Sequence, residues 1–189
     1  MAEISINIRR ARPDDMEGVY SVMWSTGYIQ VFYGGKSFEL ARGELLGKLF
    51  AENVEVYIAE IACAAGPDCK NGRRIVGYTI FGPYVRYYAE KNLPETVEYQ
   101  GKIYDLRGYA YSLGTGVHTD FRGQAIGPAL RMHADNQARS SGYAGIVTDV
   151  DASNTPSLRA QEKAGLIKVA EIPDKKRKSG INTVWIKVF

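Results

Sequence analysis

The sequence has no long hydrophobic run, and only four of its 189 residues are histidine or cysteine. The most apolar stretch, residues 75–81, contains Gly77 and Thr79 and is far shorter than the roughly 20 residues that a membrane span needs. The first residues contain no hydrophobic segment typical of a secretory signal peptide. We therefore expect a cytoplasmic protein that does not associate with membranes.

The scarcity of cysteine and histidine limits the metal sites that the chain can form. Neither His118 nor His133 lies at a metal-ligand spacing from Cys63 or Cys69, so the sequence predicts no metal site. The two cysteines flank the turn at residues 66–68, where they could close a small disulfide loop or, with two more ligands, bind a metal. Because nothing indicates an oxidising compartment, we expect two reduced thiols.

Composition and charge favour one globular domain. Hydrophobic residues make up 45% of the chain and charged residues 24%, which is enough apolar surface for a sizeable core. We expect a single domain over residues 1–189, with a tyrosine-rich insertion at about residues 84–108. The net charge of +3 suits an anionic small ligand, but it is too weak and too dispersed to indicate nucleic-acid binding.

Hydrophobic periodicity predicts alternating strands and helices. Strands are expected at about residues 4–8, 54–58, 75–81, 109–117, 146–150, 166–172 and 183–189, and helices at 13–23, 38–50, 123–141 and 155–164. The second and third strands should form an antiparallel hairpin, and a smaller hairpin is predicted around Gln100 and Gly101. Glycines at 114 and 116 interrupt the fourth strand, which suggests a bulge or a close backbone approach.

A turn with almost no side-chain bulk joins the fourth strand to the following helix. Gly123, Ala125 and Gly127 leave the backbone accessible where a helix N-terminus presents free N–H groups and a positive dipole end. A Walker loop is excluded because the turn has no Gly-Lys-Ser/Thr. A dinucleotide fingerprint fails because Thr119 stands where the third glycine is needed. The turn could also be a connection without a ligand.

Two motifs carry a resemblance to a known family. The first is Arg-x-x-Ala-x-Gly at residues 122–127, after the glycine-interrupted strand. The second is Asn154-x-x-Ser157, which leads to Glu-Lys-x-Gly at residues 162–165. Together they resemble the GNAT superfamily of N-acetyltransferases. The resemblance implies an α/β (α+β) fold with a mixed, mostly antiparallel central sheet of about seven strands, about four helices, and fourth and fifth strands that splay apart.

The resemblance also implies acetyl-CoA as co-substrate, with its pyrophosphate in the turn and its pantetheine arm between the splayed strands. The residues implied in cofactor binding are Val117, His118, Thr119, Arg122, Gly123, Gln124, Ala125, Ile126, Gly127, Asn154 and Ser157. Ala125 stands where the family usually has glycine. A positive φ would strain alanine by about 1 kcal/mol. We place Ala125 inside the first helical turn and expect a right-handed φ.

By resemblance, the reaction is direct attack of a primary amine on the thioester. Many relatives protonate the leaving thiol with a tyrosine at the position of Gln161, so here Ser157 or water could substitute. No carboxylate occurs at residues 109–119, where relatives often carry the base. A catalytically silent acyl-CoA-binding regulatory module is therefore the alternative to an enzyme.

Two further residues are candidates for proton transfer. Glu60 follows Val54, Val56 and Ile58 at alternate positions of the second strand, so its side chain could point inward like theirs. Burial would then raise the pKa of its carboxylate to a range suited to a base. Alternatively the strand bulges near Ala59 and the carboxylate is solvated. His118 could relay a proton through water, or it could be an ordinary side chain at a strand end.

The acceptor, a small-molecule or peptide amine, is expected at three segments, the first two of which are rich in aromatic residues. By resemblance these are residues 24–33, 84–111 and 174–180, and the candidate substrate-binding residues are Trp24, Tyr28, Tyr84 and Tyr111. The lysines and arginine at residues 175–178 could attract an acidic acceptor or could simply be solvated. The tyrosines could equally cover a homodimer interface.

Overall fold

The computed structural model describes residues 5–29, 37–64, 66 and 68–189. Part of the predicted aromatic linker, residues 30–36, lies outside this description. The chain forms two compact units, which are considered separately below. The first comprises Met1–Phe81 and Gly114–Ala134, and the second comprises Gly82–Leu113 and Asp135–Phe189.

A mixed, mostly antiparallel sheet of seven strands follows the predicted order. Strands β1 (Asn7–Arg10), β2 (Glu55–Ala62) and β3 (Arg73–Pro83) lie side by side, and the next strand of the sheet is β6 (Ala110–Val117), whose residues are divided between the two units. The β1–β2 and β2–β3 pairs are antiparallel, which confirms the predicted hairpin. A register shift at Ala59/Glu60 interrupts the β2–β3 ladder.

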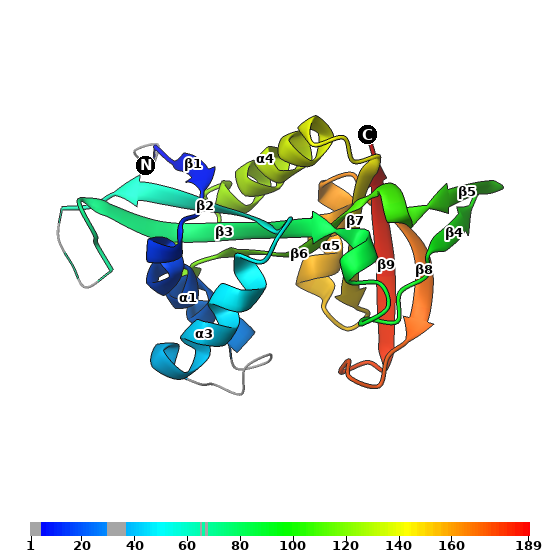
Figure 1. Ribbon diagram of the computed structural model, residues 1–189, viewed down its shortest axis with the longest axis horizontal. Helices are drawn as coiled ribbons and strands as arrows, with labels where there is room; N and C mark the ends of the chain where they lie inside the picture. Colours follow the sequence, from blue (N-terminus) through cyan, green and yellow to red (C-terminus); the bar gives the residue numbers. More distant parts are fainter. Residues whose placement is uncertain (1–4, 30–36, 65, 67) are drawn as a thin grey trace. The chain divides into compact units, whose positions relative to one another are not determined.

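Helices pack on both faces of β3 in the first unit (Figure 1). These helices are η1 (Pro13–Asp15), α1 (Met16–Ser25), α3 (Phe38–Leu49) and the first part of α4 (Ile126–Ser140). Val76 packs in a core cluster with Ile126 and Leu130 of α4. Ile75 instead approaches Gly18 of α1 so closely that a β-carbon there would lie 2.7 Å from its side chain. Because adjacent strand residues point to opposite faces, α4 and α1 cover different sides of β3.

The second unit contains the remaining strands, β7 (Gly145–Asp151), β9 (Ile181–Val188) and β8 (Ile167–Pro173), in that spatial order after β6. Helix α5 (Thr155–Lys163) follows β7, and its Leu158 packs against Val150 and Trp185. The parallel β6–β7 ladder comprises only Ala110↔Ile146 and Tyr111↔Val147, although both strands continue further. This short ladder is the expected splay of the fourth and fifth sheet strands.

The tyrosine-rich insertion contains a separate two-stranded sheet. It runs through η2 (Tyr84–Arg86), β4 (Thr96–Tyr99), β5 (Lys102–Asp105) and η3 (Leu106–Gly108). Gln100 and Gly101 form the hairpin turn with φ of 52° and 74°, as a two-residue turn with left-handed backbone requires. The small hairpin is therefore confirmed, although glutamine is an unusual residue for such a turn.

The prediction of reduced cysteines is wrong, because Cys63 and Cys69 form a disulfide. The two cysteines flank the β2–β3 turn, where the Cys63 N–H donates to the Gly72 carbonyl over 2.9 Å. This local pairing places the two cysteine Cα atoms 6.1 Å apart, within the range that a disulfide spans.

Among the described helices, none has the length and apolar character needed to cross a membrane.

Candidate functional site

The turn after β6 joins that strand to α4. Strand β6 ends at Val117, a 3-10 helix occupies Thr119–Phe121, and α4 begins only at Ile126. Gly123 has a φ of 80° and Ala125 a φ of 57°. The expectation of a right-handed φ at Ala125 is therefore wrong. The residue precedes α4 instead of lying in its first turn, because the chain needs two left-handed residues to enter the helix here.

Five consecutive backbone N–H groups, those of residues 123–127, are free of protein acceptors within the described part of the chain. Pro128 has no N–H group, and the next amide, that of Ala129, donates to the Ala125 carbonyl over 3.1 Å. The free donors therefore end where the α4 ladder begins. Such a series of amides with left-handed residues at a helix N-terminus forms an anion-binding nest.

The side chains around the turn leave the amides accessible. Arg122, Gln124 and Ala125 are exposed, as is Gly123. A β-carbon added at Gly123 would meet no heavy atom within 4 Å, and one added at Gly127 would lie 3.6 Å from Val117. The exposed Arg122 guanidinium adds a positive charge next to the five donors. The turn therefore combines free donors, open space and a nearby positive charge, which are the features of an anion site.

His118 has a local structural role at the same turn. Its Nδ1 accepts a hydrogen bond from the Asp120 N–H over 3.3 Å, and thereby caps the 3-10 helix. Its Nε2 lies 3.4 Å from an Arg74 nitrogen, and its own N–H donates to the Val76 carbonyl. A neutral imidazole can accept a hydrogen bond at only one of its nitrogens. Both ring nitrogens of His118 face donors, so the ring is poorly arranged to relay a proton.

The second motif lies at the start of α5, in the second unit. The Asn154 side chain accepts from the Ser157 N–H over 3.3 Å, which makes Asn154 the helix cap that its sequence position indicates. The Ser157 hydroxyl has no hydrogen-bond partner among the described residues. Gln161, at the position where relatives carry an acid tyrosine, is buried. An amide cannot donate a proton as an acid, so this position supplies no general acid.

Glu60 is buried as the parity of β2 predicts, with only 3% of its surface exposed, but its environment differs from the prediction. Its carboxylate accepts from Asn7 Nδ2 over 2.8 Å, Arg9 Nε over 3.1 Å and Arg73 Nη1 over 2.6 Å. Burial alone would raise the Glu60 pKa, but the bonds from Asn7, Arg9 and Arg73 outweigh it and lower the pKa. The expected raised pKa is therefore wrong, and so is the alternative of a solvated carboxylate, although the bulge at Ala59 is present.

The four candidate acceptor residues fall into two groups. Trp24 and Tyr28 belong to the first unit, where Trp24 is 45% exposed and packs beside Tyr20. Tyr84 and Tyr111 belong to the second unit, where both are buried with ring centroids 6.1 Å apart. The Tyr84 hydroxyl donates to the Pro94 carbonyl over 2.7 Å. Burial, and then the charge of Asp149, raises the Tyr84 pKa, so this hydroxyl stays protonated.

Asp149 was missed by the sequence reasoning, although it is a buried charge in the middle of β7. Its side chain is 2% exposed and accepts hydrogen bonds from the Tyr111 hydroxyl, an Arg177 nitrogen and Asn182 Nδ2. The sequence does contain a signal for this residue, because Asp149 lies within the strand predicted at residues 146–150. A carboxylate that is buried in such a strand must have hydrogen-bonding or charged partners. The interactions tie the turn at Asp174–Gly180 to the centre of the second unit.

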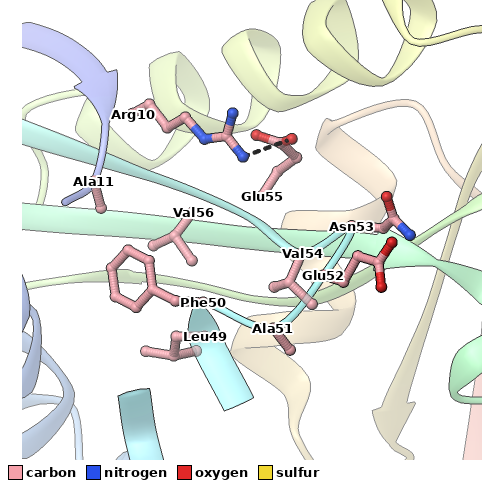
Figure 2. A pocket seen from close by; sticks show the side chains of 10 residues that line it. All are labelled: Arg10, Ala11, Leu49, Phe50, Ala51, Glu52, Asn53, Val54, Glu55 and Val56. Atoms are coloured by element: carbon pink, nitrogen blue, oxygen red, sulfur yellow. Dashed lines mark hydrogen bonds and ion pairs between the residues drawn. The ribbon is translucent and has the colours of Figure 1, made fainter. Parts of the chain in front are cut away.

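A separate pocket of about 300 Å³ lies in the first unit, lined by residues 49–56 with Arg10 and Ala11. Figure 2 shows apolar side chains on one side of this pocket and the charged Arg10–Glu55 pair, 3.0 Å apart, on another. None of the predicted site residues lines it. Among the described residues, no three histidine, cysteine or acidic side chains cluster in a way that could hold a metal ion.

The profile of the Acetyltransferase (GNAT) family matches residues 60–166, more than half of the chain. The chain belongs to the GNAT acetyltransferase family. The match begins at Glu60, near the end of β2, and covers all of β3, the bare turn and all of α5, and therefore both motifs on which the resemblance was based. Among curated proteins, no sequence matches this chain significantly.

Solved GNAT structures share this fold at low sequence identity. An N-acetyltransferase from Staphylococcus aureus Mu50 is 16% identical with a TM-score of 0.68, over 97% of this chain and 98% of the other. Ard1 from Thermoplasma volcanium is 18% identical with a TM-score of 0.62, over 98% of both chains. A putative streptothricin acetyltransferase from Bacillus anthracis, solved with acetyl coenzyme A, is 17% identical with a TM-score of 0.51, over 72% of this chain and 63% of the other.

Proposed function

We propose that this GNAT protein is an N-acetyltransferase that moves an acetyl group from acetyl-CoA to a primary amine of a small molecule or peptide. The observation that carries the proposal is the row of five free N–H groups at residues 123–127. Those amides would hold the pyrophosphate, and the exposed Arg122 would add charge. The acetyl-CoA complex of the Bacillus anthracis protein supports the choice of co-substrate.

Other residues contribute to the binding of the co-substrate in this proposal. Val117, His118 and Thr119 end β6 and lead into the turn, so their backbone would face the thioester end of the ligand. A backbone N–H group near Val117 would stabilise the developing oxyanion, although that of His118 already donates to the Val76 carbonyl. Asn154 and Ser157, at the start of α5, are proposed to contact the pantetheine arm.

The transfer forms a bond between the amine nitrogen and the acetyl carbon and breaks the carbon–sulfur bond. The amine loses a proton and the leaving thiolate gains one. An amine with a pKa of about 10.4 is neutral in only about one molecule in 10³ to 10⁴ at pH 7, which is worth roughly 4 to 5 kcal/mol. Expelling the thiol as an unprotonated thiolate, with a pKa of about 8.5, costs only about 2 kcal/mol at pH 7. Removal of the amine proton is therefore the more demanding step.

The proton carriers are proposed from the resemblance to the GNAT family. The Ser157 hydroxyl, which is free of partners among the described residues, is the proposed donor to the thiolate. Glu60 and His118 remain candidates for accepting the amine proton. Glu60 is the weaker base because its pKa is lowered, and His118 already faces two donors. Solvent water is the remaining acceptor.

A second function has its own support. The absence of an acid tyrosine at Gln161, together with the lowered pKa of Glu60, favours a catalytically silent acyl-CoA-binding regulatory module. Such a protein would keep the amide turn and bind acetyl-CoA without turnover. Cytoplasmic location, a single domain and a homodimer that buries tyrosines also remain proposals.

The test measures binding and turnover separately. We expect acetyl-CoA to raise the melting temperature of the protein, and an amine panel to release free thiol. Gly127→Val should abolish the thermal shift by covering the amides, since a side chain fits at that position without a backbone clash. Gly47→Val is the matched control, because Gly47 is also a helical glycine without a positive φ, lies in α3, and a β-carbon there would meet no heavy atom within 4 Å.

Three outcomes separate the proposals. Binding with thiol release supports the enzyme, and binding without release for any amine supports the silent module. An unchanged melting temperature at millimolar acetyl-CoA contradicts both.

A further inference from the structure

Asp149 is the centre of a buried polar cluster in the second unit. One carboxylate oxygen accepts from the Tyr111 hydroxyl, and the other accepts from Arg177 and from Asn182 Nδ2. The side chains of Asp149 and Arg177 are 2% and 20% exposed, so these interactions are shielded from water. Buried charges with this many partners are organised groups whose geometry is fixed.

Lys91 is the loosely held member of the cluster. Its Nζ lies 3.9 Å from the Asp149 oxygen that also binds Tyr111, and 5.2 Å from the centre of the Tyr111 ring. The Lys91 side chain is 33% exposed, and it makes no closer hydrogen bond within the described residues. A carboxylate beside an aromatic face is a favourable environment for an ammonium group. Here the chain fills that environment with its own primary amine, from the solvent side.

The cluster also contains an acceptor that nothing satisfies. Asn182 is 1% exposed, and its Nδ2 donates to Asp149. Its Oδ1 is buried and has no hydrogen-bond partner within the described residues. An unpaired buried acceptor is unfavourable, so a hydrogen-bond donor placed beside Asn182 Oδ1 would stabilise the cluster.

We propose that Asp149, Asn182 and the ring of Tyr111 form a binding site for the ammonium group of the acceptor, and that Lys91 occupies the part of this site beside Asp149 Oδ1 and the Tyr111 ring until the acceptor displaces it. The ligand class is a primary alkylammonium, which offers several N–H donors and a compact positive charge. Asp149 and Asn182 Oδ1 accept from the ammonium, and the Tyr111 ring covers it. The assignment of the ligand as the acceptor rests on the proposed acetyltransferase function.

The chemistry of the cluster selects this class. The site offers a carboxylate, a vacant amide oxygen and an aromatic face, and each of these favours a cation that can donate hydrogen bonds. An anion would be repelled by Asp149, because Arg177 is already engaged with that carboxylate and with Asp174 at 3.4 Å. An amine acceptor is mostly protonated at neutral pH, so it would arrive in the form that this site binds.

The experiment titrates the full chain with n-butylammonium chloride in the absence of acetyl-CoA. The readout is the nuclear magnetic resonance shift of the Asn182 side-chain NH₂ group and of the backbone amides of residues 111 and 149. We expect saturable shifts. Uncharged n-butanol should produce none, and tetramethylammonium chloride, which cannot donate hydrogen bonds, should not reproduce them at the same ionic strength.

Variants at two lysines separate displacement from a general charge effect. Lys91→Met keeps the length of the side chain but removes the competing ammonium, so butylammonium should bind at least about fivefold more tightly. Lys102→Met is the matched control, because Lys102 Nζ also lies over a tyrosine ring, that of Tyr104 at 5.0 Å. No carboxylate pairs with Lys102 within the described residues, so this variant should bind like the unaltered protein. Asp149→Asn should weaken binding at least about tenfold.

Equal affinities for the Lys91→Met and Lys102→Met proteins would overturn the proposal, as would identical shifts with butylammonium and tetramethylammonium. If Asp149→Asn does not fold, the two lysine variants decide the question alone. A parallel thermal shift with acetyl-CoA distinguishes failure of this site from failure of the proposed function. Loss of the ammonium response with a preserved acetyl-CoA response rejects the ammonium site only.

Discussion

Replacing Ala125 with glycine should stabilise this protein, although glycine usually destabilises a helical region. Ala125 has a φ of 57°, and a residue with a β-carbon is strained there by about 1 to 2 kcal/mol. Glycine removes that strain, but it makes the unfolded chain more flexible, which offsets about 0.4 to 1 kcal/mol. The expected net gain in the free energy of unfolding is therefore about 0.5 to 1 kcal/mol.

The assay is urea denaturation of the unaltered protein, Ala125→Gly and Ala129→Gly. Ala129 lies four residues further on, inside α4, with its N–H bonded to the Ala125 carbonyl. The same substitution there should lower the stability by about 0.5 to 1 kcal/mol, since helical φ does not need glycine. Destabilisation of equal size at both positions would refute the left-handed assignment of Ala125. The Ala125→Gly protein keeps its N–H group, so its affinity for acetyl-CoA should not fall.

Three further perturbations test other parts of the account. Glu60→Gln should destabilise the protein by about 1 to 3 kcal/mol at neutral pH. Folding lowers the Glu60 pKa from its ordinary value of 4.5. The stabilisation by the ionised Glu60 is therefore complete above pH 4.5 and is lost as the pH falls through the lower pKa of the folded state. Urea denaturation curves of the unaltered protein and of Glu60→Gln should therefore converge in acid. Reduction of the Cys63–Cys69 disulfide, or replacement of both cysteines by serine, should lower the stability by about 2 kcal/mol, measured by urea denaturation with and without reductant. Tyr84→Phe should lower it by about 1 kcal/mol, because the buried hydroxyl donates to the Pro94 carbonyl; no change in the urea midpoint would contradict that bond.

The sequence was a good guide to the secondary structure because each element has a strong pattern of its own. The alternation in β2 and the apolar stripe of α4 predicted both elements without tertiary information. Gly142 was correctly predicted to end α4, and it has a φ of 83°. Asn154 was correctly predicted to cap the start of α5. Local signals of this kind depend on neighbouring residues only.

The start of α4 was placed three residues too early, because no side chain marks it. The turn offers glycine and alanine, which are compatible with a first helical turn and with an irregular connection. The left-handed φ of Ala125 depends on the path of the connection between β6 and α4, which the sequence alone does not specify.

Glu60 and the cysteines show how partners distant in sequence change a residue's chemistry. Parity predicted that Glu60 is buried, but its pKa depends on β1, whose Asn7 lies opposite Glu60 in the antiparallel register. The two cysteines were compatible with thiols, a disulfide or a metal site from spacing alone. The turn of the hairpin places their Cα atoms 6.1 Å apart.

The acceptor region was the least predictable part of the site. Tyrosine content pointed to Tyr84 and Tyr111, but a contact such as that between Tyr111 and Asp149 joins residues 38 positions apart. Asp149 itself was a visible anomaly in an apolar strand. Its partners Arg177 and Lys91 come from the final hairpin and from the insertion, so only the fold brings them together.

The central claim is that the backbone amides of residues 123–127 bind the diphosphate of acetyl-CoA. The most direct measurement is a titration of ¹⁵N-labelled protein with coenzyme A, followed by amide chemical shifts, with pantetheine as the ligand that lacks the diphosphate. The account predicts that the amides of Gly123, Gln124, Ala125, Ile126 and Gly127 show the largest shifts with coenzyme A and little change with pantetheine. Saturable binding of coenzyme A that leaves these five resonances in place would contradict it.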